Sequence, residues 1–411
     1  MAILNSLFDK KESDDLAWSI GNVILSGAEN EGGQKLYFNT LREFLLQKKT
    51  VILLDGLISR EKHLILTKYT SGLVGEGNIT DLGYFDASDS VDILSAFEKI
   101  DDKANFVADM ISDVLEMSET VKKRVYRYFL YAMEALELLG KEYFLRDVLQ
   151  LDVDAVIDLV HALPLSDADK KRRLLFLEDK GTYLLYLDIG TGVEVIERSG
   201  LIPIFSGDTK LSKLLGAGCA VMLKGLVEDA PGEKKLLFDL FLKALEKYME
   251  SARKSDVVFI IRNADFISHH YMINAFEYHS SYRCATYYFV EDITRYVQKN
   301  GNQLLDKANG FLVFQQGSDE NASFWSAFFG GREMQESTYS YMKKKSWNPF
   351  SVMSNEGGVV SGSQSYDETT KNVQIVYKPL YRPEVFKELK PTEVMCYLCK
   401  PLIRKKARIE V

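Results

Sequence analysis

The run Gly21-Asn-Val-Ile-Leu-Ser26-Gly27-Ala-Glu-Asn-Glu-Gly32-Gly33-Gln34-Lys35-Leu36 lies near the beginning of the chain. Its first part, Gly21–Ser26, is apolar enough for a buried strand, and a glycine-rich loop follows. The residues after the loop predict a helix over Gln34–Lys48 and a second strand over Thr50–Asp55. A strand, a glycine-rich loop and a helix in this order are typical of a phosphate-binding loop.

The loop lacks the side chains that hold phosphate and metal in a working site. A complete motif has the form G-x-x-x-x-G-K-[ST], in which the lysine reaches the phosphates and the hydroxyl holds magnesium. If Gly33 is the second glycine, Gln34 occupies the lysine position and Lys35 the hydroxyl position. A helix turns about 100° per residue, so the Lys35 amine leaves from a different face. We therefore expect a degenerate phosphate loop.

Other features of the loop favour and oppose anion binding. Gly27, Gly32 and Gly33 can supply tight backbone turns, and a helix N-terminus attracts anions. Glu29 and Glu31, however, place two carboxylates in the predicted loop, and these would repel a triphosphate. Whether any nucleotide binds here therefore stays open from the sequence.

The second half of a nucleotide site is expected at the end of the apolar strand Val257–Ile261. In ATPases with a phosphate loop, an aspartate here holds magnesium and a glutamate polarises the attacking water. This chain has Arg262 and Asn263 at those positions. A guanidinium opposes a metal cation, and an amide cannot accept a proton. We therefore predict no catalytic residue and no metal ligand at this site.

The pattern of apolar runs indicates an α/β fold that is interrupted by helices. Short buried strands separated by amphipathic helices predict a mostly parallel sheet covered on both faces. Between them the sequence is mostly helical, and one of the expected helices is Asp92–Ile100. We predict a discontinuous α/β domain over residues 1–88 and 200–411, with an inserted all-helical domain over residues 89–199. Residues 347–370, rich in Ser, Gly and Asn, predict a long surface loop or hairpin region.

Composition narrows the class of protein. The chain has 411 residues, 46% of them apolar, which is enough for a large core. No run of about 18 apolar residues predicts a membrane span, and the first residues show no leader pattern. The four cysteines indicate a reducing compartment, and Cys396 and Cys399 lack further ligands for a zinc site. We expect a cytoplasmic protein, recruited to the inner face of the membrane, if at all, by partners.

The net charge of −8 bears on nucleic-acid binding. Surfaces that follow phosphates carry clustered Lys and Arg, and this chain is acidic overall. Its short basic runs are more typical of solvated helix faces. The sequence therefore does not favour nucleic acid as a partner.

The order of these segments resembles the type IV coupling proteins of bacterial conjugation and type IV secretion, the TraG/TraD-like relatives of hexameric DNA translocases. The resemblance begins at the strand, loop and helix near Gly27 and includes the helical insertion and the strand Val257–Ile261. Its last piece is the segment Leu380–Lys400, with Lys390-Pro-Thr-Glu-Val-Met395 and Lys400-Pro401, which is similar to the family's closing motif. It implies a P-loop NTPase-like fold of the RecA/FtsK kind.

The chain also departs from that family. Family members carry an N-terminal membrane anchor, intact Walker A and Walker B motifs, and a glutamine where this chain has Glu291. The resemblance thus implies a pseudo-ATPase: a scaffold or regulator that binds other secretion or conjugation proteins, as a homo- or hetero-oligomer, without a cofactor. The alternative is a divergent active ATPase that drives DNA or protein transfer, with Lys35 binding phosphate. A third reading is a nucleotide sensor that binds ATP without hydrolysis.

Overall fold

The computed structural model describes residues 21–408, except 29, 84–88, 227–228, 253–255, 264–266, 283, 348–362 and 400–401. The described chain forms two compact units. The larger comprises the chain up to Gly317 together with the part from Leu389 onward, and the smaller comprises Ser318–Glu388.

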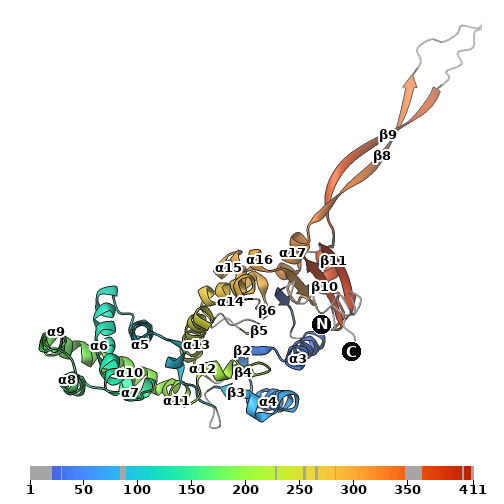
Figure 1. Cartoon of the computed structure of the whole chain (residues 1–411). Helices are drawn as coiled ribbons and strands as arrows, with labels where there is room; N and C mark the ends of the chain where they lie inside the picture. Colours follow the sequence, from blue (N-terminus) through green and yellow to red (C-terminus); the bar gives the residue numbers. More distant parts are fainter. Residues whose placement is uncertain are drawn as a thin grey trace, which may run out of the picture. The chain divides into compact units, whose positions relative to one another are not determined.

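The larger unit is built on a nine-stranded sheet formed by strands from the described part of the chain (Figure 1). From β7 to β3 each neighbouring pair is parallel, whereas β10 is antiparallel to both of its neighbours. The predicted mostly parallel sheet is therefore confirmed. In sheet order the strands are β11 (Ile403–Arg408), β10 (Glu393–Leu398), β7 (Gly310–Val313), β1 (Asn22–Ser26), β6 (Ala285–Val290), β5 (Val257–Arg262), β2 (Thr50–Ile58), β4 (Ala220–Leu226) and β3 (Ile79–Leu82).

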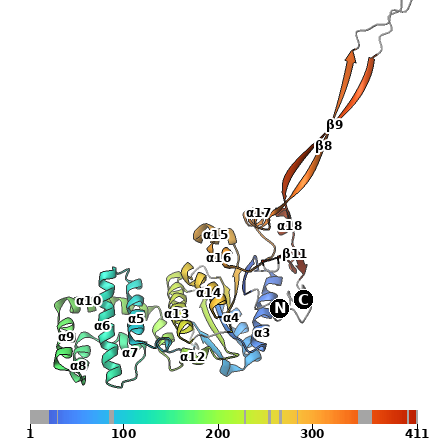
Figure 2. The same ribbon diagram turned by 45° about the horizontal axis from the view of Figure 1, so that its top comes forward.

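Helices cover the two faces of this sheet (Figure 2). On one face, α3 packs Leu36, Tyr37 and Phe44 into a core with alternate residues of the central strands. On the other face, the Thr286 hydroxyl donates to the Ala275 carbonyl of α14. Burial of both faces explains why the central strands are continuous apolar runs. The helices and short turns around the sheet are α3 (Glu31–Leu46), α4 (Arg60–Val74), η1 (Glu76–Asn78), α13 (Pro231–Ala252), α14 (His269–Tyr282), α15 (Ile293–Asn300) and α16 (Gln303–Lys307).

A block of helices lies between β3 and β4 in the chain, where the sequence predicts one. The predicted helix Asp92–Ile100 is wrong, because Asp92 caps only a short 3-10 turn and the next helix begins at Ile100. That residues 89–199 form a domain of their own stays a prediction. The elements of the block are η2 (Ile93–Ala96), α5 (Ile100–Val114), α6 (Glu119–Leu138), α7 (Leu145–Leu149), α8 (Val153–Ala162), α9 (Asp167–Leu177), α10 (Lys180–Arg198), α11 (Leu201–Phe205) and α12 (Leu211–Leu214).

The two segments that lead into and out of this block are bonded to each other. The Val91 amide donates to the Ile204 carbonyl at 2.8 Å, and the Asp92 amide donates to the Thr209 carbonyl at 2.9 Å. Gly207 lies so close to Ser90 that an added Cβ would be 2.2 Å from the serine hydroxyl. Position 207 therefore requires glycine, because the segments that enter and leave the helical block pass close together here.

The smaller unit consists of α17 (Asp319–Phe328), β8 (Gly331–Trp347), β9 (Ser363–Pro379) and α18 (Pro383–Lys387). β8 and β9 form a long antiparallel ribbon, paired from Gly331 with Pro379 to Trp347 with Ser363 (Figure 1). Part of the predicted loop or hairpin region at 347–370 is thus strand, and residues 348–362 lie outside the described residues. The core of this unit contains Trp325, Phe329 and Phe386.

Candidate functional site

The connection between β1 and α3 is shorter than the sequence predicts. The helix begins at Glu31, three residues before the expected start at Gln34. Gly32 and Gly33 therefore lie in the first turn of α3, and the Gln34 amide already donates to the Asn30 carbonyl at 3.0 Å. The reason is Asn30, a favoured N-cap residue, whose side-chain oxygen accepts a hydrogen bond from the Gly33 amide at 2.9 Å.

The N-terminus of α3 is capped by groups of this chain. An open helix N-terminus binds anions through its free amides. Here the Gly33 amide already donates a hydrogen bond to the Asn30 side chain. The negative charge of Glu31, in the first turn, complements the positive end of the helix dipole. Lys35 forms an ion pair with Glu31 at 2.8 Å, one turn apart on the helix surface. The hydrogen bond from Lys35 lowers the pKa of Glu31. The lysine thus pairs with a carboxylate of its own helix.

A buried glutamine side chain occupies the space beside the first glycine of the loop. Gln316 follows β7, and its amide nitrogen donates to the carbonyls of Ser26 at 3.3 Å and Phe314 at 2.9 Å. Gly27 has a φ of 72°, and an added Cβ would be 2.5 Å from that nitrogen. A Cβ on Gly33 would be 2.0 Å from the Ala28 carbonyl oxygen. These glycines therefore permit close packing between the loop, α3 and the segment after β7.

The Walker B positions contribute to a buried polar contact at the carboxyl end of the sheet. Asp55 of β2 is 1% exposed and lies in register with Arg262 at the end of β5. The side-chain Nδ2 of Asn263 donates to Asp55 Oδ1 at 3.2 Å, and an Arg262 guanidinium nitrogen lies 3.9 Å from Asp55 Oδ2. The guanidinium also lies over the Tyr37 ring of α3, 4.6 Å from its centroid. Arg262 and Asn263 thus interact with the carboxylate at this edge.

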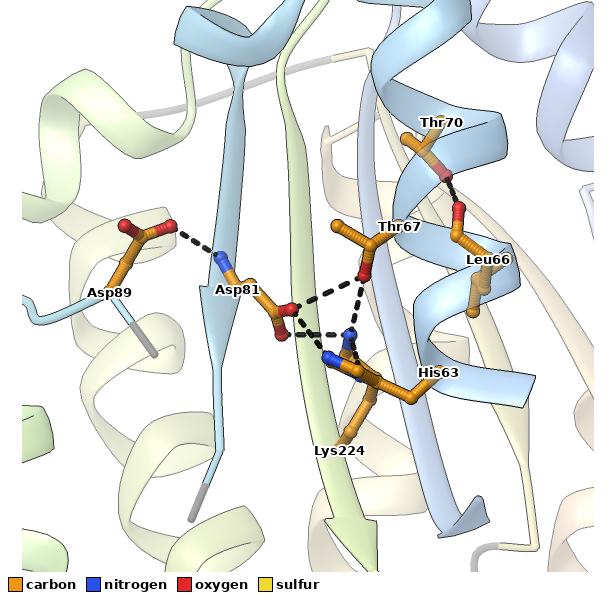
Figure 3. Close-up of polar contacts among 7 residues, drawn as sticks. All are labelled: His63, Leu66, Thr67, Thr70, Asp81, Asp89 and Lys224. Atoms are coloured by element: carbon orange, nitrogen blue, oxygen red, sulfur yellow. Dashed lines mark hydrogen bonds and ion pairs between the residues drawn. The ribbon is translucent and has the colours of Figure 1, made fainter. Parts of the chain in front are cut away.

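A second buried contact lies on the neighbouring strands and was not predicted (Figure 3). Lys224 of β4 is fully buried. Its ammonium group forms an ion pair with Asp81, 2.8 Å from Oδ1, and donates a hydrogen bond to Thr67 Oγ1 at 3.3 Å. It also meets Nδ1 of His63, a residue of α4. The ammonium therefore contacts three polar groups, which come from Asp81, Thr67 and His63.

His63 connects the two charged members of this cluster. Its Nε2 lies 3.1 Å from Asp81 Oδ2, so the ring donates from Nε2 and accepts at Nδ1. Burial and then the Lys224 charge lower the pKa of His63 and keep the ring neutral. Burial also lowers the pKa of Lys224, although the Asp81 carboxylate opposes this effect. We name His63, Thr67, Asp81 and Lys224 the lysine cluster.

Together these groups form a row of alternating charge across four neighbouring strands. Asp55 of β2 lies in register with Lys224 on one side and Arg262 on the other, and Asp81 is on β3 next to Lys224. In sheet order the row is Asp81, Lys224, Asp55 and Arg262. The charges compensate one another inside the protein. In the described residues, no three His, Cys, Asp or Glu side chains gather so that they could hold a metal ion.

The sequence contained one sign of this row. Lys224 interrupts the otherwise apolar strand Ala220–Leu226, and a lysine in such a strand needs a buried partner. Its partners come from β3 and α4, which sequence reasoning did not identify. The predicted positions Gly27, Gln34 and Lys35 surround the start of α3, whereas Arg262 and Asn263 contact Asp55.

Three comparisons place this geometry among known proteins. No protein-family model matches the chain, and no curated protein matches its sequence. Solved structures of the bacterial conjugative coupling protein TrwB, truncated by 70 residues, do match. The unbound form has a TM-score of 0.59 and 9% identity, and the match covers 96% of this chain and 87% of that one.

Two nucleotide complexes of the coupling protein TrwB match to the same extent. The complex with ADP and Mg²⁺ has a TM-score of 0.57 and 10% identity, and the match covers 97% of this chain and 86% of that one. The complex with a non-hydrolysable ATP analogue has a TM-score of 0.59 and 10% identity, with 97% and 87% covered. The resemblance to type IV coupling proteins is thus confirmed at the level of a P-loop NTPase-like fold. In the part of the chain that the structure describes, no helix is long and apolar enough to cross a bilayer.

Proposed function

We propose that this chain is a catalytically inactive, coupling-protein-like subunit that acts as a scaffold or regulator in a bacterial conjugation or type IV secretion system. One observation carries the loss of catalysis. At both halves of the expected nucleotide site, side chains of this chain bind the groups that would contact phosphate or metal in a working site. Asn30 caps α3, and Arg262 and Asn263 contact Asp55.

A nucleotide would have to displace these contacts before it could bind as in a working phosphate loop. The Gly33 amide would have to leave Asn30, and the triphosphate would approach the Glu31 carboxylate. Magnesium would meet the Arg262 guanidinium, which already lies beside Asp55. Each change removes an internal hydrogen bond or places like charges together, and both are unfavourable. These costs support a site that does not turn over ATP.

The shared fold supports the setting in conjugation or secretion. The TrwB structures are described as those of a conjugative coupling protein, and the match covers nearly the whole chain. A subunit that keeps this fold without the catalytic set retains its surfaces for binding other proteins. We therefore propose secretion or conjugation proteins as its partners, with any membrane contact made through them.

The alternative function is a divergent ATPase that drives DNA or protein transfer. It is favoured by the match to structures of TrwB with bound nucleotide and by Lys35 in the first turns of α3. In this reading Lys35 leaves Glu31 to bind phosphate, and a neighbouring subunit supplies the missing catalytic groups.

Nucleotide binding and phosphate release distinguish the two functions. The purified chain is incubated with Mg-ATP, phosphate release is measured, and labelled ATP is titrated in parallel. We expect no turnover, and the Lys35→Ala variant is expected to behave like the wild type. Turnover of about 1 per second or more, a usual enzyme rate, would contradict the proposal. Loss of nucleotide binding in Lys35→Ala would favour the ATPase, and binding without release would identify a nucleotide sensor.

A further inference from the structure

A second site lies away from the expected nucleotide site, in a cleft where helices of the block face helices that cover the sheet. Its volume is about 1040 Å³, and it is lined by α5 and the segment after it, α10, α13 and the beginning of α14. We name it the α5–α13 cleft. All of these elements belong to the larger unit. Its apolar lining consists mainly of Val114, Met117, Val195, Leu236 and Leu240.

The cationic side chains that line the cleft have carboxylate partners in the chain. Lys243 of α13 pairs with Asp109 of α5, and Arg198 pairs with Glu194 at 3.2 Å. Lys235 pairs with Asp239 at 3.1 Å. These pairs cancel the positive charge that the cleft would otherwise present.

Two carboxylates of the lining, those of Asp113 and Glu116, differ from these paired groups. Within the described residues, the side chains of Asp113 and Glu116 form neither an ion pair nor a hydrogen bond, and both residues are exposed. Partial burial of its carboxylate in the cleft raises the pKa of Asp113, although the charges of nearby lysines oppose this shift. Burial and then the charges of Asp239, Glu246, Asp113 and Asp109 raise the pKa of the Tyr271 phenol, which also lines the cleft. The cleft therefore has a negative potential above an apolar lining.

We propose that the α5–α13 cleft docks a basic, amphipathic peptide segment of a partner protein. Apolar side chains of the segment pack against the apolar lining of the cleft, and a lysine or arginine pairs with Asp113 and Glu116. The charge excludes nucleic acid, because its phosphates would face these carboxylates. A small polyamine would leave the apolar lining uncovered. This inference rests on the proposed scaffold function, since it names the partner chemistry that the scaffold recognises.

The test uses the full chain and a labelled peptide of about 12 residues built from leucine and lysine, followed by fluorescence anisotropy. A matched peptide carries glutamate in place of lysine, and unlabelled spermidine serves as a competitor. We expect the lysine peptide to bind, the glutamate peptide not to bind, and spermidine not to compete. Asp113→Asn and Glu116→Gln should each weaken binding about fivefold, as partly exposed ion pairs do, and the double variant more. Asp188→Asn removes an exposed carboxylate of α10 outside the cleft and should leave binding unchanged.

The outcomes separate this inference from the proposed function. The inference is overturned if the lysine peptide does not bind at about 1 mM, if the glutamate peptide binds equally well, if spermidine competes, or if the double variant binds like the wild type. Thermal unfolding of the double variant, expected to match the wild type, shows that its effect is local. The ATP assay is run on the same protein. ATP turnover together with intact peptide binding would contradict the pseudo-ATPase function and support the docking site. No turnover together with a loss of peptide binding would contradict the docking site alone.

Discussion

The row of charges at the carboxyl end of the sheet differs from the α5–α13 cleft in how its carboxylates are compensated. In the row, Asp55 and Asp81 lie beside the buried Lys224 and the largely buried Arg262, and are themselves largely removed from water. In the cleft, among the residues that the structure describes, Asp113 and Glu116 form no ion pair, whereas the lining cations Arg198, Lys235 and Lys243 are paired. A compensated buried charge contributes to structure, because removing either partner is costly. An uncompensated charge at the edge of an apolar cleft is available for binding.

The largest effect is expected when the buried row is interrupted. Lys224→Met removes the ammonium and leaves Asp81 and the His63 ring without their main partner. We expect a loss of about 3–5 kcal/mol in the free energy of unfolding, as for one partner of a buried ion pair. Urea unfolding followed by circular dichroism measures it. Lys213→Met, at an exposed lysine, should change stability by less than about 0.5 kcal/mol. Equal stability of the two variants would mean that the row is not structural.

A smaller effect is expected from pH, through His63. Its pKa in the folded protein is lowered, so the unfolded chain binds the proton more readily. The stabilisation is therefore full above the unfolded pKa of about 6.5 and is lost as the pH falls towards the lowered folded value. As the pH falls from about 7.5 to 5.5, the free energy of unfolding of the wild type should decrease more than that of His63→Gln. Urea unfolding at both pH values tests this, and parallel curves for the two proteins would contradict it.

The smallest effect is expected at the cleft. Asp113→Asn removes a carboxylate that has no ion pair within the described residues and whose charge is opposed by burial. We expect its free energy of unfolding to stay within about 0.5 kcal/mol of the wild type. The same urea measurement applies. A loss of more than about 2 kcal/mol would show that Asp113 is a structural residue and would remove the contrast with the row.

The sequence predicted the parts of the fold that depend on local pattern. The apolar run at Val257–Ile261 became a central buried strand, which local pattern alone predicts. The start of α3 was misplaced because the glycines at 32 and 33 suggested a loop, whereas the cap by Asn30 allows them in the first helical turn. The ribbon of β8 and β9 was only partly expected, because strand pairing depends on contacts that periodicity does not show.

The sequence predicted the candidate site from the motif residues that it lacks. It did not predict the contacts that the residues at those positions form. Gln34, Arg262 and Asn263 can be recognised as departures from a motif with no knowledge of the structure. That Arg262 lies beside Asp55 and over Tyr37 follows from the pairing of β5 with β2 and the packing of α3. The lysine cluster depends likewise on α4 and β3, which carry His63 and Asp81.

The amino-acid sequence by itself determined that this chain forms a mostly parallel α/β sheet and that it lacks the lysine, hydroxyl and acidic residues of a working phosphate site. Both properties are local, because they depend on residue types at fixed spacing along the chain. The tertiary structure decided which charges compensate one another and which remain available. Strand order and register bring Asp81, Lys224, Asp55 and Arg262 together across four strands. The packing of helices around the cleft, in contrast, leaves Asp113 and Glu116 without an ion pair among the described residues.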